Sequence, residues 1–133
     1  MRLVLKVLGG LVALLLLVVI LQFVASESGE VVVLTSTDAG GTPQETRLWV
    51  VDLDGQWYLR TGSEASGWYR RLVANPQVTV GRGDGVFAAT AVPEPAKRDT
   101  INGLMNAKYG WADDFIDLMF GREDAIPILL DRT

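Results

Sequence analysis

A run of twenty uncharged residues near the amino terminus constrains this chain more than any other feature. It extends from Val7 to Ser26 and follows a short flank that carries Arg2 and Lys6. Twenty residues of α-helix rise about 30 Å, which matches the hydrocarbon thickness of a bilayer. The sequence therefore predicts a transmembrane anchor over residues 1–26 and one folded domain over residues 27–133.

A cleaved secretory signal is the alternative for this segment, because a basic start followed by apolar residues is also its pattern. The uncharged run exceeds the roughly 7–15 residues of a signal core. Near its end, only Val24 and Ser26 offer a small-residue pair for cleavage, and the pair is poor. We favour a single-pass anchor in the cell membrane. No basic residue follows until Arg47, so the positive-inside rule places the domain on the outer side, periplasmic or extracellular.

The composition of the predicted domain excludes several classes of function. Residues 27–133 hold ten Lys or Arg and sixteen Asp or Glu, a net charge of −6. Nucleic-acid binding needs a basic surface, so we expect none. The chain has no Cys and no His. Thiol nucleophiles, disulfides, His-based triads, Cys/His zinc sites and haem ligated by His or Cys are therefore excluded.

Alternation of β-branched and polar residues predicts a mainly β domain with helices. Asp54-Gly55 is a strong signal for a tight hairpin between two of the strands. Short hairpin connections make the sheet mostly antiparallel, and six such strands can close a small split β-barrel. The expected strands are residues 30–37, 45–53, 56–61, 77–82, 86–92 and 125–131.

Three helices are expected beside these strands. The first begins at Thr61, which forms a capping-box pattern with Glu64, and it stops before Pro76. A second helix carries Ile101, Leu104, Met105 and Lys108 on one face. A third spans Trp111 to Phe120, with Phe115, Leu118 and Met119 expected to point inward. Pro127 in the last strand predicts a sheet edge or a strand end.

Arginines and aromatic residues gather between the second strand and the end of the first helix. Arginine suits bidentate contact with phosphate or carboxylate, and a helix start at Thr61-Gly62-Ser63 offers free N–H groups to an anion. The alternative is structural: Arg70 and Arg71 form a solvated helix end, and the tryptophans belong to the barrel core. The only basic residues between Ser26 and Lys97 are Arg47, Arg60, Arg70, Arg71 and Arg82.

The stretch WYRRLVANPQVTV, residues 68–80, resembles the W-Y-x-N-L-x-A-N-P-x-V-x-V element of the nitroreductase-type deazaflavin-dependent oxidoreductases. That family belongs to the wider flavin reductase and pyridoxamine phosphate oxidase-like split β-barrels. TRLWVV before the hairpin and YLRTGS after it resemble the second and third strands of the group. The resemblance covers residues 30–92 and implies a deazaflavin or FMN cofactor, and a homodimer.

The resemblance also implies a set of site residues. Trp49 and Leu48 would back the cofactor ring, and Tyr109 and Trp111 would contact the substrate. The remaining cofactor-binding positions, on the phosphate-bearing side, would be Arg47, Arg60, Thr61, Gly62, Ser66, Trp68 and Arg71. No residue is assigned as a catalytic nucleophile, because the cofactor would carry the hydride.

The chain departs from the family pattern at three places. Residues 38–44 lack the basic turn of the family, Arg71 stands in place of an Asn, and Trp68 replaces a phosphate-binding lysine of the phosphate oxidase branch. FMN, or no cofactor, therefore stays an alternative to a deazaflavin.

Three functional hypotheses follow. The first is a membrane-anchored oxidoreductase that transfers hydride to a small organic acceptor. The second is a non-catalytic, membrane-tethered barrel that binds a ligand or a partner. The third is a structural subunit that contacts a membrane partner through Val7 to Ser26. Asp113, Asp114 and Asp117 are read as a solvated helix face rather than a metal site, because carboxylate-only sites need more converging oxygens.

Overall fold

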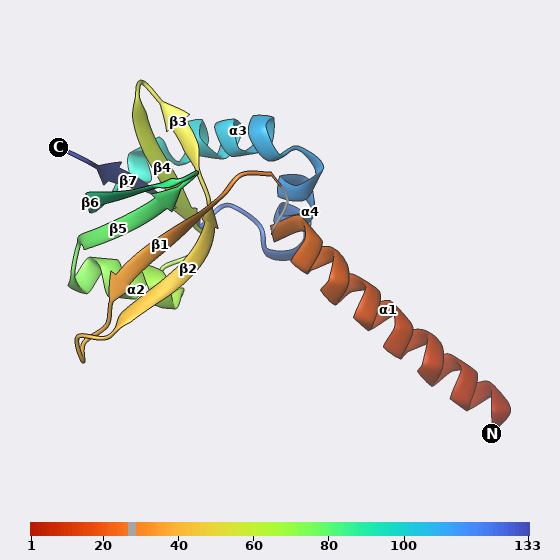
Figure 1. Cartoon of the computed structure of the whole chain (residues 1–133). Coiled ribbons are helices and arrows are strands. Elements are labelled where there is room, and N and C mark those ends of the chain that lie inside the picture. The colour runs from red at the N-terminus through yellow and green to blue at the C-terminus, as the bar shows by residue number, and fades with distance from the viewer. Residues whose placement is uncertain (27–28) are drawn as a thin grey trace.

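The protein is described by a computed structural model, which covers residues 1–26 and 29–133. A long helix, α1 (Arg2–Ser26), projects from a small β domain that carries the other helices (Figure 1). The predicted boundary of the domain at residue 27 lies outside the described residues.

Seven antiparallel strands form one curved sheet, a half-barrel, in the order β2-β1-β5-β6-β7-β4-β3. The prediction of a mainly β, antiparallel domain is confirmed. The strands are β1 (Val31–Thr37), β2 (Pro43–Trp49), β3 (Val51–Leu53), β4 (Gln56–Thr61), β5 (Gln77–Arg82), β6 (Gly85–Pro93) and β7 (Ile126–Asp131).

The seventh strand arises because the predicted strand 45–53 is interrupted at Val50. Its first part, β2, pairs with β1, and its second part, β3, pairs with β4. One stretch of chain thus supplies both ends of the strand order, which curls the sheet around its core. That core contains Val32, Leu34, Leu59, Trp68, Leu72, Val80, Ile128 and Leu130, all buried.

Two tight turns agree with the sequence. Asp54 and Gly55 connect β3 to β4 with φ of 53° and 78°, the left-handed pair that a two-residue hairpin needs. Gly83, with φ of 58°, opens a second two-residue turn, between β5 and β6.

The first helix of the domain starts later than predicted. α2 spans Gly67–Ala74, not 61–74, because Thr61 is still paired to Ile126 at the end of β4. The Thr61 hydroxyl donates to the carbonyl of Ser63 at 2.8 Å and contacts the Ser66 hydroxyl. These local bonds compete with a helical turn. The helix ends before Pro76, as expected.

Two consecutive helices, α3 (Arg98–Tyr109) and α4 (Trp111–Phe120), lie together against one end of the sheet, after a short 3₁₀ helix, η1 (Pro95–Lys97) (Figure 1). Ile101, Met105 and Tyr109 form a second buried cluster with Val51 and Tyr58. The predicted extent of α4 is confirmed, and the predicted helix around residues 101–108 corresponds to α3.

The predicted orientation of α4 is wrong in part. Leu118 is 82 % exposed and Met119 is 42 % exposed, while the buried side of the helix carries Ala112 and Asp113. The prediction that Asp113 belongs to a solvated helix face is therefore wrong, because its carboxylate is buried and ion-paired to Arg60. The prediction for Pro127 is also wrong in part: it lies near the start of β7, but β7 is an interior strand between β6 and β4.

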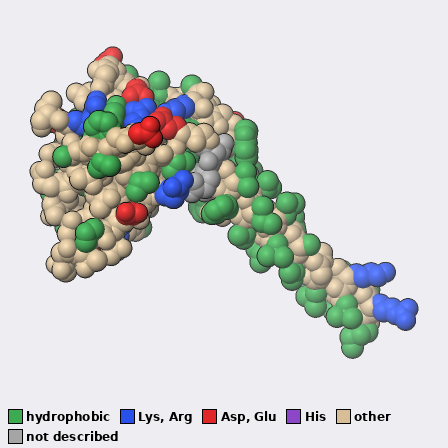
Figure 2. Space-filling model, in the orientation of Figure 1, with side chains coloured by type: hydrophobic (Ala, Val, Ile, Leu, Met, Phe, Trp, Pro, Cys, Tyr) green, Lys and Arg blue, Asp and Glu red, His purple; other side chains and the backbone are tan. Residues whose placement is uncertain are grey.

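α1 is apolar and exposed over nearly its whole length, and its last turns contact α4 (Figure 1). In Figure 2, hydrophobic side chains cover this helix and basic side chains occur only near its free tip. Residues 2–25 are long and apolar enough to cross a membrane, a property that a signal sequence shares.

Candidate functional site

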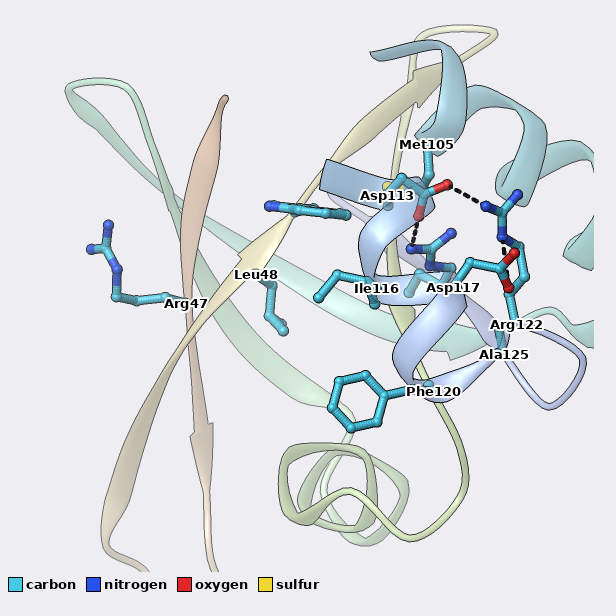
Figure 3. Close-up of a pocket in the computed structure, with 13 residues that line it drawn as sticks. Arg47, Leu48, Met105, Asp113, Ile116, Asp117, Phe120, Arg122 and Ala125 are labelled. Atoms are coloured by element: carbon cyan, nitrogen blue, oxygen red, sulfur yellow. Dashed lines mark hydrogen bonds and ion pairs between the residues drawn. The ribbon is translucent and has the colours of Figure 1, made fainter. Parts of the chain in front are cut away.

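A cavity of about 250 Å³ lies between the sheet and the two carboxyl-terminal helices (Figure 3). β2 and β4 form one wall, α3 and α4 the other, and the loop from α4 to β7 closes one side. The lining residues are Arg47, Leu48, Trp49, Arg60, Gly62, Met105, Asp113, Ile116, Asp117, Phe120, Gly121, Arg122 and Ala125.

Most of the cavity wall is apolar. Leu48 from β2 faces Ile116 and Phe120 from α4 across the space (Figure 3). Trp49 lies beside Leu48 and stacks on Tyr109, with ring centroids 4.3 Å apart and planes within 8°. Such walls suit a flat, largely apolar ring system.

Tyr109 holds Trp49 and the interrupted strand in place. The Val50 N–H donates to the Tyr109 hydroxyl at 3.0 Å, and this hydroxyl donates to the Glu30 carbonyl at 2.6 Å. Burial raises the pKa of Tyr109 to about 12, against a lowering by the backbone bond at Val50. Tyr109 therefore stays protonated at neutral pH, and its hydroxyl both accepts and donates a hydrogen bond from a fixed position.

A buried carboxylate organises the charged part of the cavity. Asp113 is 1 % exposed and accepts a 2.6 Å bond from Arg60 on β4. Arg122 approaches its other oxygen at 3.3 Å, and the Asn106 amide donates to that same oxygen at 3.2 Å. Arg122 also lies 3.3 Å from Asp117. Figure 3 shows Asp113, Asp117 and Arg122 in this arrangement.

The electrostatic balance follows from these contacts. Among the side chains that line the cavity, Arg60 and Arg122 face Asp113 and Asp117, and these four charges balance. The exposed carboxylate of Asp114 lies 3.5 Å from Arg122 but outside the lining. Asp113 needs both guanidinium groups, because an unpaired charge buried this deeply is costly. The charged wall is therefore an ordered, nearly neutral hydrogen-bonding surface rather than a strongly cationic one.

Five of the nine residues predicted to bind the cofactor line the cavity: Arg47, Leu48, Trp49, Arg60 and Gly62. Arg47 contributes its stem, since its guanidinium points away from the Asp113 cluster (Figure 3). Arg47 is paired with Val33 on β1, and Arg60 with Pro127 on β7. The hairpin pairing that the predicted strands 45–53 and 56–61 implied for these two arginines does not form.

The other four lie outside the cavity lining. Thr61 and Ser66 bond to each other in the turn before α2, and Trp68 is buried in the barrel core. Arg71 donates from Nε to the Ser36 hydroxyl at 3.0 Å and from an η nitrogen to the Thr46 hydroxyl at 3.3 Å.

The two residues predicted to contact substrate are also outside the lining. Tyr109 is buried behind Trp49, and Trp111 is 55 % exposed at the start of α4. A substrate role for either residue stays a prediction.

Sequence reasoning missed the wall that α3, α4 and the loop after α4 supply. Met105 was predicted only as part of one helix face, and Ile116 was not singled out. No local sequence pattern indicates that Asp113 pairs with an arginine 53 positions earlier. The one sequence feature that pointed to this wall was the spacing of Asp113 and Asp117, which places both carboxylates on one face of a helix. Within the described residues no group of acidic side chains forms a metal-binding cluster, and these carboxylates face arginine instead.

Comparison with solved structures identifies the fold. Rv2991 from Mycobacterium tuberculosis superposes with a TM-score of 0.62 at 20 % identity, over 85 % of this chain and 78 % of that one. An F420-H2-dependent reductase, FDR-A, matches with a TM-score of 0.59 at 25 % identity, over 75 % of this chain and 93 % of that one. The chain has the split-barrel fold of the F420-dependent reductases. The resemblance seen in the sequence is thus confirmed at the level of fold.

A third split barrel, described as a domain-swapped dimer, matches with a TM-score of 0.62 at 21 % identity, over 77 % of this chain and 80 % of that one. No protein-family model matches the sequence, and no curated protein matches it significantly.

Proposed function

We propose that this split barrel is a membrane-anchored oxidoreductase that binds a deazaflavin in the cavity and transfers hydride to a small organic acceptor. The observation that carries the proposal is the cavity itself. It forms at Leu48, Trp49 and Gly62, where the sequence resemblance expects the cofactor, in a chain whose fold matches an F420-H2-dependent reductase.

The residues of the cavity fit the ring portion of such a cofactor. The volume of about 250 Å³ and the walls of Leu48, Trp49, Ile116 and Phe120 suit a planar ring, although the volume is small for a whole nucleotide. Gly62 presents backbone without a side chain, and a Cβ added there would meet no atom within 4 Å, which leaves room for close approach.

The anionic tail of the cofactor would run outside the cavity. Arg71 on α2 is suited to it, because both hydroxyl partners of its guanidinium are uncharged. Arg60 is less suited, since its charge already serves Asp113.

A bound deazaflavin would supply the hydride. The chain would supply orientation: Trp49, fixed by the stack on Tyr109, would hold one face of the ring. Arg60 and Arg122, fixed by Asp113, would present N–H donors to a polar edge of the cofactor or acceptor. Ile116 and Phe120, on the cavity side of α4, would exclude water.

The decisive experiment titrates the full chain in phosphatidylcholine nanodiscs, separately with F420 and with FMN. Tryptophan quenching and the anisotropy of cofactor fluorescence are followed together. We expect saturable binding of F420 at micromolar or tighter affinity. Trp49→Phe should lose most of the quenching and keep the anisotropy change within a few-fold, because it removes the reporter and retains an aromatic wall. Binding of FMN without binding of F420 would support the proposed site and identify FMN, not a deazaflavin, as its cofactor.

A non-catalytic, ligand-binding barrel is the second candidate, and one observation favours it. The turn where the family carries basic residues is folded around Asp38, which accepts bonds from the backbone of Gly40 and Thr42 and from the side chain of Gln44. Absence of an anisotropy change with both cofactors would select this candidate and reject the oxidoreductase.

The proposal includes anchoring through α1, with the domain on the outer side of the membrane. The exposed apolar surface of α1 and the basic residues of its amino-terminal flank support this arrangement. We also propose that the protein forms a homodimer, supported by the dimeric split barrel among its structural neighbours. Crosslinking in nanodiscs and protease protection in vesicles test these two points.

A further inference from the structure

Helix α4 carries an apolar stripe on its outward side. Trp111, Phe115, Leu118 and Met119 recur at helical spacing and so share one face. Leu118 is 82 % exposed, Trp111 is 55 % exposed, and Phe115 is partly buried. We call these four residues the α4 stripe.

The stripe inverts the usual pattern of a surface helix. Such a helix normally turns its apolar face inward and its charges to water. Here Asp113 is buried and ion-paired, whereas a tryptophan and a leucine face outward. Asp113, on the inward face, already has Arg60 and Arg122 as ion-pair partners. The apolar side chains of the outward stripe therefore need another surface to cover them.

The position of α1 indicates what covers it. The last turns of α1 contact α4, where Ala25 is fully buried, and the remainder of α1 stands away from the domain (Figure 1). If α1 spans a bilayer, its carboxyl end lies at the membrane surface. The domain element beside that end is α4, so the stripe continues the apolar surface of α1 at the level of the lipid headgroups.

We propose that α4 docks on the lipid surface through the α4 stripe and holds the barrel against the membrane. Tryptophan and leucine on an amphipathic helix are suited to the interface between headgroups and acyl chains. The inference rests on the anchoring that is part of the proposed function, and it is independent of the cofactor.

The charge around the stripe predicts how docking responds to lipid type. Asp114, on the edge of the same face, is 70 % exposed, and no basic residue lies within α4. Docking should therefore be driven by apolar contacts. Anionic lipid should not strengthen it, and salt should have little effect, in contrast with a polybasic membrane site.

The chain has no cysteine, so single-cysteine variants of the full-length protein can each carry one spin label. Leu118→Cys reports the stripe, Leu14→Cys reports the middle of α1, and Gln56→Cys is a control on the β3–β4 hairpin, away from α1 (Figure 1). Relaxation by oxygen and by a water-soluble nickel chelate is compared in phosphatidylcholine vesicles. We expect a high oxygen-to-nickel ratio at residue 14, an intermediate ratio at residue 118 and a low ratio at residue 56.

Each alternative outcome is decisive. A nickel-accessible label at residue 118 with a deep label at residue 14 overturns the docking and leaves the anchor intact. A label at residue 118 shielded from both reagents means that a second copy or another protein covers the stripe, which also overturns the docking. A nickel-accessible label at residue 14 rejects the anchor, and the docking with it.

A second measurement leaves Leu118 in place. Vesicles of brominated phosphatidylcholine quench tryptophans that lie near the acyl chains. We expect quenching in the native sequence and its loss in Trp111→Phe, which keeps the stripe apolar but removes the exposed tryptophan. Equal quenching in both proteins would assign the signal to another tryptophan and count against the docking.

Discussion

At the scale of single residues, Asp113 is the residue on which the candidate site depends. Its carboxylate joins β4, α3 and the loop after α4, because it contacts Arg60, Asn106 and Arg122. Replacing it leaves two guanidinium groups facing a neutral partner inside the protein. The cost should fall on stability and on the shape of the cavity together.

We expect Asp113→Asn to lower the free energy of unfolding by about 3 kcal/mol, the usual cost of removing one partner of a buried ion pair. Asp117→Asn is the matched control: its carboxylate is 39 % exposed and has one ion-pair partner, Arg122, among the described residues, so the loss should be under about 1 kcal/mol. Urea denaturation of both variants measures the difference. Equal losses would mean that Asp113 is not the central contact.

Tyr109 predicts a dependence of stability on alkaline pH. Its pKa is raised by burial to about 12 in the folded protein, against an ordinary value of 10.0. The unfolded chain therefore loses this proton first, and stability falls as pH rises from 10 to 12, by up to about 1.4 kcal/mol per pH unit. Tyr109→Phe should be less stable at neutral pH and should lack this part of the slope. Denaturation curves at several pH values compare the two, and identical slopes would contradict the assignment.

At the scale of elements, the turns were predictable and the start of α2 was not. Asp54-Gly55 requires a left-handed backbone, and that requirement is local. Pro76 likewise ended α2 where expected. Thr61 had a capping pattern, yet strand pairing with Ile126, sixty-five positions away, kept it in β4. A local sequence pattern does not reveal pairing with a residue so far along the chain.

The β3–β4 hairpin gives a prediction with a matched control. Gly55 has φ of 78°, so Gly55→Ala should destabilise the domain by about 1 kcal/mol. Gly103 lies in α3 with no atom within 4 Å of an added Cβ, so Gly103→Ala should stabilise by up to about 1 kcal/mol. Chemical denaturation should show opposite signs, and a neutral Gly55→Ala would contradict the turn geometry.

At the scale of the whole molecule, the fold class and five of the thirteen residues that line the cavity followed from the sequence. Leu48, Trp49 and Gly62 could be placed because their strand and turn are local features. The facing wall of Ile116 and Phe120 could not, since it depends on how α4 docks on the sheet. The outward orientation of Leu118 could not be predicted for the same reason, because hydrophobicity alone does not determine whether a side chain packs in the core or faces lipid.

The separation of α1 from the domain makes a further prediction. Residues 2–17 are exposed throughout, so their deletion should leave the melting temperature in detergent unchanged within about 3 °C. Deletion of residues 2–26 also removes the buried Ala25 beside α4 and should lower it by more. A large loss from the shorter deletion would show that the helix contributes to the fold itself.

The interruption at Val50 has a consequence for how the protein opens. The amide proton of Val50 is held by the side chain of Tyr109, and Lys108 donates to the Val50 carbonyl at 2.8 Å. Neither bond is a backbone hydrogen bond between strands. The Val50 amide should therefore exchange with deuterium whenever α3 separates from the sheet at Val50, while the amides of β5 and β6 stay protected. Exchange at Val50 as slow as in those strands would mean that helices and sheet unfold as one cooperative unit. Faster exchange at Val50 would identify the junction of β2 and β3 as the first part of the barrel to open locally.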